Sequence, residues 1–301
     1  MTLKKDALFY GAASEIITPF DANGDIKYNL IEEQVKFLIE KGIKGLFANG
    51  LASEALMMTT DERLESLKIA VKAANGRVPI MGNVIYNSVS EASDFVARSE
   101  NLGVDAIIIT PPLVYKYSDQ AMFDYFNGIA RSTKLPVYLY NAPETGNKIA
   151  PEMIKKLFDT TENFWGYKDS TQDIIHQHTL LSIMDKNRHF ELMAGSDAQI
   201  VTTMLMGGLG ILSLISCVFP EIIVEVVAAA DDGNWDRARN LQEKILRVRK
   251  ALKIGPFMDA YKYVSTLTGG ANLGEVRGPL SVLSSSEKEK IVAILKEEEM
   301  I

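Results

Sequence analysis

Apolar and polar residues follow two alternating patterns along this chain. Short apolar runs of five to seven residues are each followed by a longer segment in which apolar residues recur every three or four positions. The apolar runs lie at 13–19, 45–49, 78–84, 105–110, 136–141, 164–168, 190–195 and 210–216. Segments between them, such as 30–42 and 90–103, have the periodicity of amphipathic helices. The pattern predicts eight strands that each lead into a helix.

Eight strand–helix units in succession favour one architecture. Strands separated by helices pair in parallel, and eight such units predict closure into a (β/α)8 barrel, here over residues 1–226. A doubly wound open sheet is the alternative, although no G-x-G-x-x-G motif follows the first strand. Residues 227–301 are expected to form helices that pack on the barrel. These helices are predicted at 234–253, 259–269 and 285–299.

Composition narrows the classes of protein that fit this fold. With 301 residues, of which 47% are apolar, the chain can bury a large core. A net charge of −7 without a basic stripe argues against nucleic acid as a partner. Cys217 is the single cysteine, which is typical of a reducing compartment. The start of the sequence lacks a signal-peptide pattern, and no apolar run approaches the ~20 residues of a membrane span. We therefore expect a cytoplasmic protein without membrane contacts.

A barrel of this kind carries its active site where the strands end, and Lys168 ends the sixth run. Period-two alternation puts Phe164, Gly166 and Lys168 on one face, with Gly166 leaving room for the long side chain. A desolvated amine loses its proton more readily and becomes a nucleophile toward ketones. An ordinary ion pair, for example with Asp169, is the alternative.

Two neighbouring strand ends carry further candidates. Tyr140 ends the fifth run, where a phenol can shuttle protons for an imine-forming lysine. A tyrosine that merely fills the barrel is the alternative. The sequence ANGLASEA at 48–55 follows the second strand, and successive N–H groups in such a glycine-containing turn can hold a carboxylate. A plain strand-to-helix turn is the competing interpretation.

Other polar positions carry weaker signals. His176 and His178 are two residues apart and do not share a helix face, so we expect no metal site. The loop at 194–197 contains no lysine or arginine, and its Asp197 would repel a phosphate. The substrate is therefore expected to be unphosphorylated. Tyr261, on a late helix, is assigned to packing.

Two motifs together resemble one known family. YLYNAP at 138–143 and GYKDS at 166–170 are similar to the Tyr-Asn-x-Pro and Gly-x-Lys-[Asp/Glu] signatures of the dihydrodipicolinate synthase and N-acetylneuraminate lyase family. Further similar segments lie at 16–26, 110–118, 140–152, 166–175, 194–197 and 274–280. The resemblance implies a pyruvate-dependent class I aldolase: a barrel with a three-helix tail, usually a homotetramer, without a metal or an organic cofactor.

The resemblance also implies roles for residues. Lys168 would form a Schiff base with the keto carbon of a 2-oxo acid such as pyruvate, and Tyr140 would relay protons. The turn of Gly50, Leu51, Ala52 and Ser53 would bind the pyruvyl carboxylate. The remaining expected substrate-binding residues are Tyr115, Gly195, Ser196, Asp197 and Ser213.

The second-strand turn departs from the family pattern. The family has Gly-[Thr/Ser]-Thr-Gly-Glu, whereas this chain has Gly50-Leu51-Ala52-Ser53-Glu54. Two hydroxyls are thus missing, one that orients the tyrosine and one that helps to hold the carboxylate. Losing one such donor can cost about 3 kcal/mol of transition-state stabilisation. In a second departure, Pro112 and Leu113 replace an aromatic pair, which leaves Tyr115 as the surviving member.

The resemblance also bears on the aldehyde partner. Dihydrodipicolinate synthase carries an arginine shortly after Tyr-Asn-x-Pro, but this chain has Glu144-Thr145-Gly146-Asn147 there. The loop is more similar to that of archaeal 2-keto-3-deoxygluconate aldolases, and a neutral-to-acidic pocket fits a polyol tail. We therefore predict a 2-keto-3-deoxy sugar acid aldolase. The alternatives are a dihydrodipicolinate synthase, an N-acetylneuraminate lyase, a 2-oxo acid dehydratase, and a non-catalytic relative that binds 2-oxo acids.

Overall fold

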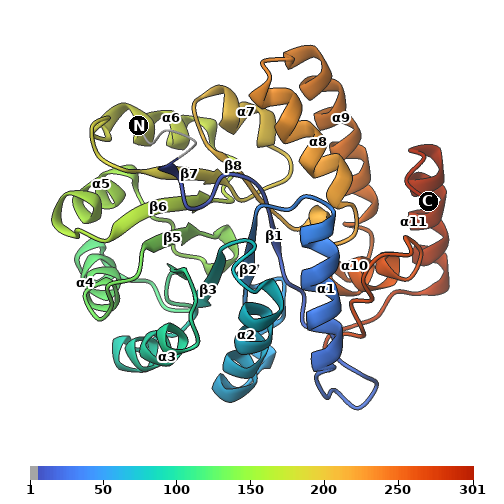
Figure 1. The fold of residues 1–301 in the computed structure, drawn as a ribbon, viewed down its shortest axis with the longest axis horizontal. Helices are drawn as coiled ribbons and strands as arrows, with labels where there is room; N and C mark the ends of the chain where they lie inside the picture. Colours follow the sequence, from blue (N-terminus) through green and yellow to red (C-terminus); the bar gives the residue numbers. More distant parts are fainter. Residues whose placement is uncertain (1–5) are drawn as a thin grey trace.

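Eight parallel strands close into a barrel in the order of the chain, and β8 pairs with β1 (Figure 1). The computed structural model describes residues 6–301. The strands are β1 (Gly11–Glu15), β2 (Gly45–Ala48), β3 (Ile80–Val84), β4 (Ala106–Ile109), β5 (Val137–Asn141), β6 (Phe164–Asp169), β7 (Glu191–Ala194) and β8 (Gly210–Ser213). The predicted (β/α)8 barrel is confirmed, and the open-sheet alternative is wrong.

A helix follows every strand and packs on the outside of the barrel. These helices are α1 (Tyr28–Glu40), α2 (Thr60–Ala74), α3 (Val89–Asn101), α4 (Asp119–Ala130), α5 (Pro151–Thr160), α6 (Ile174–Ile183), α7 (Ile200–Leu205) and α8 (Pro220–Asp231). In α1, Ile31, Val35 and Leu38 are buried at the spacing of one helix face. The apolar periodicity of the sequence therefore faces the strands.

Three further helices form the tail. They are α9 (Trp235–Ala251), α10 (Phe257–Ser265) and α11 (Ser285–Glu297), as the sequence predicts. The tail lies on the side of the barrel that carries α1 and α8 (Figure 1). Helix α9 packs against α8 and α11, and α10 lies near the short 3-10 helix η4 (Ile215–Cys217). This course brings parts of the tail to the edge of the barrel.

Alternating strand residues divide the core in two. One layer lies between strands and helices, and a smaller one fills the barrel, where Phe47, Ile108 and Tyr138 pack together. At the end where strands begin, the Glu191 carboxylate accepts a hydrogen bond from the Tyr138 hydroxyl at 2.6 Å. It also accepts from the backbone N–H of Phe9 at 3.0 Å. These contacts close the barrel at the end where the strands begin, and its open space lies at the end where the strands finish.

Candidate functional site

A cavity of about 520 Å³ lies at the end of the barrel where the strands finish. The predicted site residues that line it are Leu51, Ala52, Tyr140, Lys168, Gly195, Ser196 and Asp197. Four others are absent from its wall: Gly50, Ser53, Tyr115 and Ser213. Seven of the predicted site residues therefore share one cavity at the strand ends.

Lys168 is buried in the barrel, with 3% of its surface exposed. Its Nζ lies 3.9 Å from the ring centroid of Tyr140 and 4.4 Å from that of Phe47. Burial lowers the pKa of Lys168, and the nearby Glu15 carboxyl opposes only part of that effect. Asp169 is not its partner, because that carboxylate accepts hydrogen bonds from Thr171 and, at 2.8 Å, from Gln177. The amine thus faces the cavity as a weakened base.

The approach of β6 to Lys168 differs from the predicted alternation. The pairing of β5 with β6 shifts by one residue, so that Val137 lies opposite Phe164 while Tyr138 lies opposite Gly166. Phe164 therefore packs in the outer layer and does not share a face with Lys168. The space at Gly166 is filled by the Tyr138 ring, since a Cβ there would lie 2.3 Å from that ring. Gly166 makes room for the tyrosine, and the prediction that it makes room for the lysine is wrong.

Tyr140 lies opposite Lys168 in the register of β5 and β6. Its side chain is 8% exposed and contacts the Phe47 ring edge-on, with 6.2 Å between the centroids. Burial raises the pKa of the Tyr140 phenol, the Glu15 charge adds to this, and hydrogen bonding to Ser170 opposes it. A phenol held in its neutral form can donate and receive a proton beside the amine.

The turn after β2 is more enclosed than the sequence suggests. The Ser53 side chain is fully buried, and its hydroxyl donates to the Gly50 carbonyl at 2.7 Å. The Ser53 backbone N–H donates to Glu15 Oε1 at 3.0 Å, and the nearby Ala52 amide lowers the pKa of that carboxyl. A carboxylate does occupy this turn, but it belongs to the chain itself. One of the expected pyruvate-binding amides, that of Ser53, is therefore already engaged.

Glu15 is the functional candidate that sequence reasoning missed. It ends β1, is 4% exposed and lines the same cavity as Lys168. Burial raises its pKa to about 7, against the opposing effects of Lys168 and the amide hydrogen bonds. Gly50 is needed beside it, because a Cβ there would lie 2.0 Å from Glu15 Oε1. A signal existed, since Glu15 is the only charged residue between Gly11 and Pro19.

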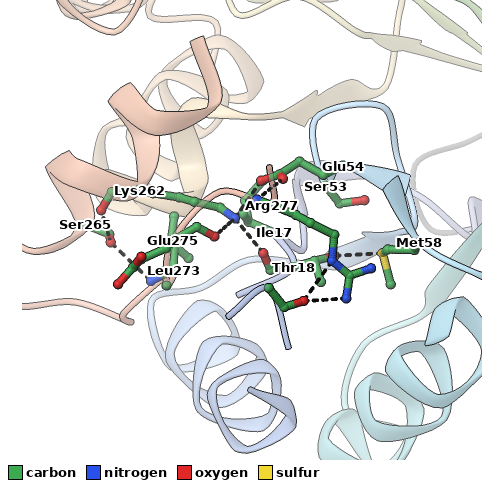
Figure 2. Close-up of polar contacts among 12 residues, drawn as sticks. Ile17, Thr18, Ser53, Glu54, Met58, Lys262, Ser265, Leu273, Glu275 and Arg277 are labelled. Carbon is green, nitrogen blue, oxygen red and sulfur yellow. Dashed lines mark hydrogen bonds and ion pairs between the residues drawn. The ribbon is translucent and has the colours of Figure 1, made fainter. Parts of the chain in front are cut away.

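A buried ion pair anchors the far side of this turn (Figure 2). Lys262 of α10 places its Nζ 2.6 Å from Glu54 Oε1, with both side chains 1% exposed. The same Nζ donates to the carbonyls of Thr18 at 2.8 Å and Glu275 at 2.5 Å. The Arg277 backbone N–H donates to Glu54 Oε2 at 2.9 Å. The tail thereby holds the end of β1 and the turn after β2 in one arrangement.

Asp197, after β7, completes the polar wall. Its Oδ1 accepts a hydrogen bond from the Ser213 hydroxyl, and its Oδ2 accepts from the N–H groups of Leu214 and Ile215, each at 3.4 Å. Burial raises the pKa of Asp197, and these donors oppose the shift. Ser213 therefore supports Asp197 and does not line the cavity.

Tyr115 lies outside the cavity of the single chain. Its side chain is 67% exposed in the loop after β4, next to Val114, which is 85% exposed with a φ of 73°. Its carbonyl accepts a hydrogen bond from Asn147 at 2.9 Å. Within one chain, Tyr115 is not positioned to contact a substrate.

The outer wall of the cavity comes from segments that no local motif marks. Arg249, Lys253 and Tyr261 of the tail line it, together with Glu144 from the loop after β5. Tyr261 is thus more than the packing residue predicted. The prediction of a neutral-to-acidic pocket is wrong for this wall, because it carries the basic side chains of Arg249 and Lys253 as well as the acidic Glu144. Only the return of the tail over the barrel brings Arg249, Lys253 and Tyr261 to the cavity.

The arrangement suits chemistry on a carbonyl carbon. A buried amine with a lowered pKa can attack it, and Tyr140 and Glu15 can move protons beside the amine. Within residues 6–301, no group of three or more His, Cys, Asp or Glu side chains is arranged to hold a metal ion. In the same residues, no helix has the length and apolar character needed to cross a membrane.

Comparisons with known proteins agree with this geometry. Residues 8–298 match the dihydrodipicolinate synthetase family. A 4-hydroxy-tetrahydrodipicolinate synthase of Kosmotoga olearia is 32% identical over 94% of this chain and 96% of its own. A probable 2-dehydro-3-deoxy-D-pentonate aldolase of Escherichia coli, YjhH, is 30% identical over 95% of this chain and 96% of its own. The crystal structure of E. coli YagE in complex with pyruvate has a TM-score of 0.93 and 26% identity, covering 98% of this chain and 100% of that one.

Proposed function

Since the chain belongs to the dihydrodipicolinate synthetase family, whose members are pyruvate-dependent aldolases and lyases, we propose that it cleaves a 2-keto-3-deoxy sugar acid to pyruvate and an aldehyde through an imine on Lys168. The protonated imine withdraws electrons from the neighbouring C–C bond as that bond breaks. Tyr140 moves the proton of the hydroxyl at which the aldehyde forms.

The observation that carries this proposal is the state of the Lys168 amine. It lines the cavity, its pKa is lowered by burial, and its ammonium form has aromatic faces as its near neighbours. A lysine of this kind is expensive to bury in charged form and is reactive in neutral form. Pyruvate in the similar YagE structure supports the same ligand class here.

The sugar acid is favoured by the loop after β5. Glu144 lines the cavity where the loop carries no arginine, and a carboxylate there accepts hydrogen bonds from the hydroxyls of a polyol. YjhH, whose printed name is a pentonate aldolase, supports this substrate class.

A synthase is the second candidate function. Arg249 and Lys253 line the outer cavity and offer cations to the carboxylate of an aldehyde partner such as aspartate semialdehyde. The synthase name of the Kosmotoga relative supports this candidate. Glu144 opposes it, because a carboxylate in the same cavity repels a second anion.

Borohydride trapping with pyruvate tests the proposed mechanism. An adduct that a peptide map places on Lys168 would support the imine. An aldehyde panel, with glyceraldehyde, glycolaldehyde and aspartate semialdehyde, then separates the aldolase from the synthase by which aldehyde consumes pyruvate. Pyruvate binding without an adduct in wild-type protein would indicate a non-catalytic relative and contradict the proposal.

Assembly into a homotetramer remains part of the proposal. The exposed Val114 and Tyr115 support it, because apolar side chains at a strained loop tip are typical of a contact between subunits. Light scattering of the purified protein measures the number of copies.

The single buried Cys217 suits a cytoplasmic enzyme.

A further inference from the structure

The turn after β2 raises a question that the family pattern does not answer. Leu51 and Ala52 line the cavity where hydroxyls are expected, so neither side chain can pass a proton to or from the imine. The chain places a different titratable group at this point. Glu15 reaches the same turn from β1, and its Oε1 accepts the Ser53 N–H at 3.0 Å. Gly50 has no Cβ to block it.

We propose that Glu15 carries the protons of imine formation at Lys168, in place of the hydroxyls absent from positions 51 and 52. This inference rests on the proposed function, since it concerns the same amine and the same 2-oxo acid. It adds a catalytic residue at a strand end where the family pattern names none.

Imine formation moves two protons among Lys168, Glu15 and the former carbonyl oxygen of the substrate. Glu15, as a carboxylate, takes one proton from the Lys168 ammonium through a water molecule in the cavity that both line, and the neutral amine attacks the keto carbon, forming a C–N bond. A second proton moves from nitrogen to the former carbonyl oxygen, which gives a carbinolamine. Glu15 then returns its proton to that hydroxyl, the C–O bond breaks and water leaves. The products are a protonated imine, one water and Glu15 again as a carboxylate.

The surroundings of Glu15 suit a group that both takes and gives a proton. Burial raises its pKa to about 7, so both forms are populated at neutral pH. The titratable groups that face it from the packed elements are Lys168 of β6, Tyr140 of β5, Asp197 after β7, Cys217 of η4 and Tyr261 of α10. Among these, Lys168 is the cation, and its charge lowers the pKa of Glu15 against the effect of burial.

Substrate binding fits the same role. The Ser53 amide is bonded to Glu15, so the substrate carboxylate has one donor fewer in this turn and gains from another. The protonated form of Glu15 supplies one, because two carboxyl groups at close range share a site when one of them holds a proton. Binding therefore favours the form of Glu15 that later releases water.

Glu15→Gln is the decisive variant, since glutamine keeps an oxygen for the Ser53 N–H and an N–H for the substrate. We expect the maximal rate of imine formation, measured by quenching with borohydride and weighing the intact protein, to fall by about 100-fold or more. The half-saturating pyruvate concentration should stay within about threefold of wild type, because binding needs no ionised carboxyl. The wild-type rate should depend on a group that titrates near pH 7, and the variant should lose that dependence.

Glu191→Gln is the matched control. Glu191 is also a fully buried glutamate of the barrel, but it lies at the opposite end, bonded to Tyr138 and Phe9. The same substitution there should leave the imine rate within about threefold of wild type at a temperature where both are folded. In a second test, formate should restore part of the rate of Glu15→Ala in proportion to its concentration, whereas chloride should not.

Each outcome decides the inference. A Glu15→Gln rate within threefold of wild type overturns it, as does a variant that changes only the half-saturating concentration. Should Glu15→Gln fail to fold, a wild-type imine rate that does not vary between pH 5.5 and 8.5 overturns it. These results leave the Lys168 imine standing. Wild-type protein that forms no adduct with any 2-oxo acid instead overturns the proposed function and this inference together.

Discussion

Two lysines of this protein are almost equally buried but have contrasting surroundings. Lys262 is 1% exposed and Lys168 is 3% exposed, and burial lowers the pKa of both. The Lys262 Nζ forms an ion pair with the Glu54 carboxylate at 2.6 Å and donates hydrogen bonds to the carbonyls of Thr18 at 2.8 Å and Glu275 at 2.5 Å. Lys168 has two aromatic rings as its close neighbours and faces the cavity.

The difference shows that two buried lysines can differ in the acceptors that their ammonium groups meet. An ammonium offers three donors, and the cost of leaving water is offset only when those donors find acceptors. Lys262 meets that condition and stabilises the junction of barrel and tail. Lys168 does not, and burial lowers its pKa, which makes its ammonium easier to deprotonate. Four measurements can break or sharpen this contrast.

The largest expected effect is that of Lys168→Ala on catalysis. Removing the nucleophile should lower turnover of a 2-keto-3-deoxy sugar acid by about 10⁴-fold or more. The free energy of unfolding should not fall by more than about 1 kcal/mol, because the lost amine has no ion pair to break. Steady-state kinetics and urea unfolding of the same preparation give both numbers. Turnover at the wild-type rate in Lys168→Ala would contradict the proposal that Lys168 is the nucleophile.

Lys262→Met should show the reverse. The substitution leaves the buried Glu54 carboxylate without its cation, which should lower the free energy of unfolding by about 3–5 kcal/mol. Adding Glu54→Gln should recover part of this loss, because the uncompensated charge is gone. The exposed Lys290→Met is the control and should change the unfolding free energy by less than about 0.5 kcal/mol. An equal loss of unfolding free energy in Lys290→Met would mean that the buried ion pair adds no stability beyond that of an exposed lysine.

The pH dependence of the unfolding free energy tests Glu15, the carboxyl whose charge acts on Lys168. Its pKa is raised from 4.5 to about 7 in the folded chain, so the folded protein holds a proton that the unfolded chain has already lost over that interval. This contribution is complete below pH 4.5 and should be lost as pH rises to 7, a fall of about 3 kcal/mol. Comparing wild type with Glu15→Gln isolates it from other groups. If the unfolding free energies of the two proteins change with pH in parallel, the Glu15 pKa is not raised by folding.

The smallest expected effect is that of Tyr140→Phe on turnover, about 100-fold. The imine with pyruvate should still form and be trapped on Lys168, because the amine itself is unchanged. Tyr138→Phe is the matched control, since Tyr138 lies deeper in the same strand and bonds to Glu191 at 2.6 Å. A Tyr140→Phe enzyme as fast as wild type would assign the proton transfer to another group.

The sequence predicted the parts of the site that depend on strand order. Lys168 and Tyr140 lie at the ends of adjacent strands, and the apolar runs located both ends correctly. The same rule did not reveal the one-residue shift between β5 and β6, because both Phe164 and Trp165 suit a strand on either face. It also did not place Tyr115, whose exposed loop follows no periodic pattern.

Glu15 shows where residue-by-residue reasoning stopped short. Its charge in an apolar strand was visible, but what that charge contacts was not. The Ser53 amide and the Glu15 carboxyl are 38 positions apart, and they meet because β1 and β2 are neighbours in the barrel. A polar residue in a buried strand is therefore best examined against the loops of adjacent strands.

By itself, the sequence determined the alternation of strands and helices, the barrel that follows from it and the position of Lys168 at a strand end. These features depend on local periodicity and on the handedness and parallel order of strand–helix units. Only the tertiary structure decided which buried lysine is neutralised, which carboxyl fills the turn after β2 and which tail residues reach the cavity. Those outcomes depend on distances between segments far apart in the chain, and electrostatic and desolvation energies are set by such distances.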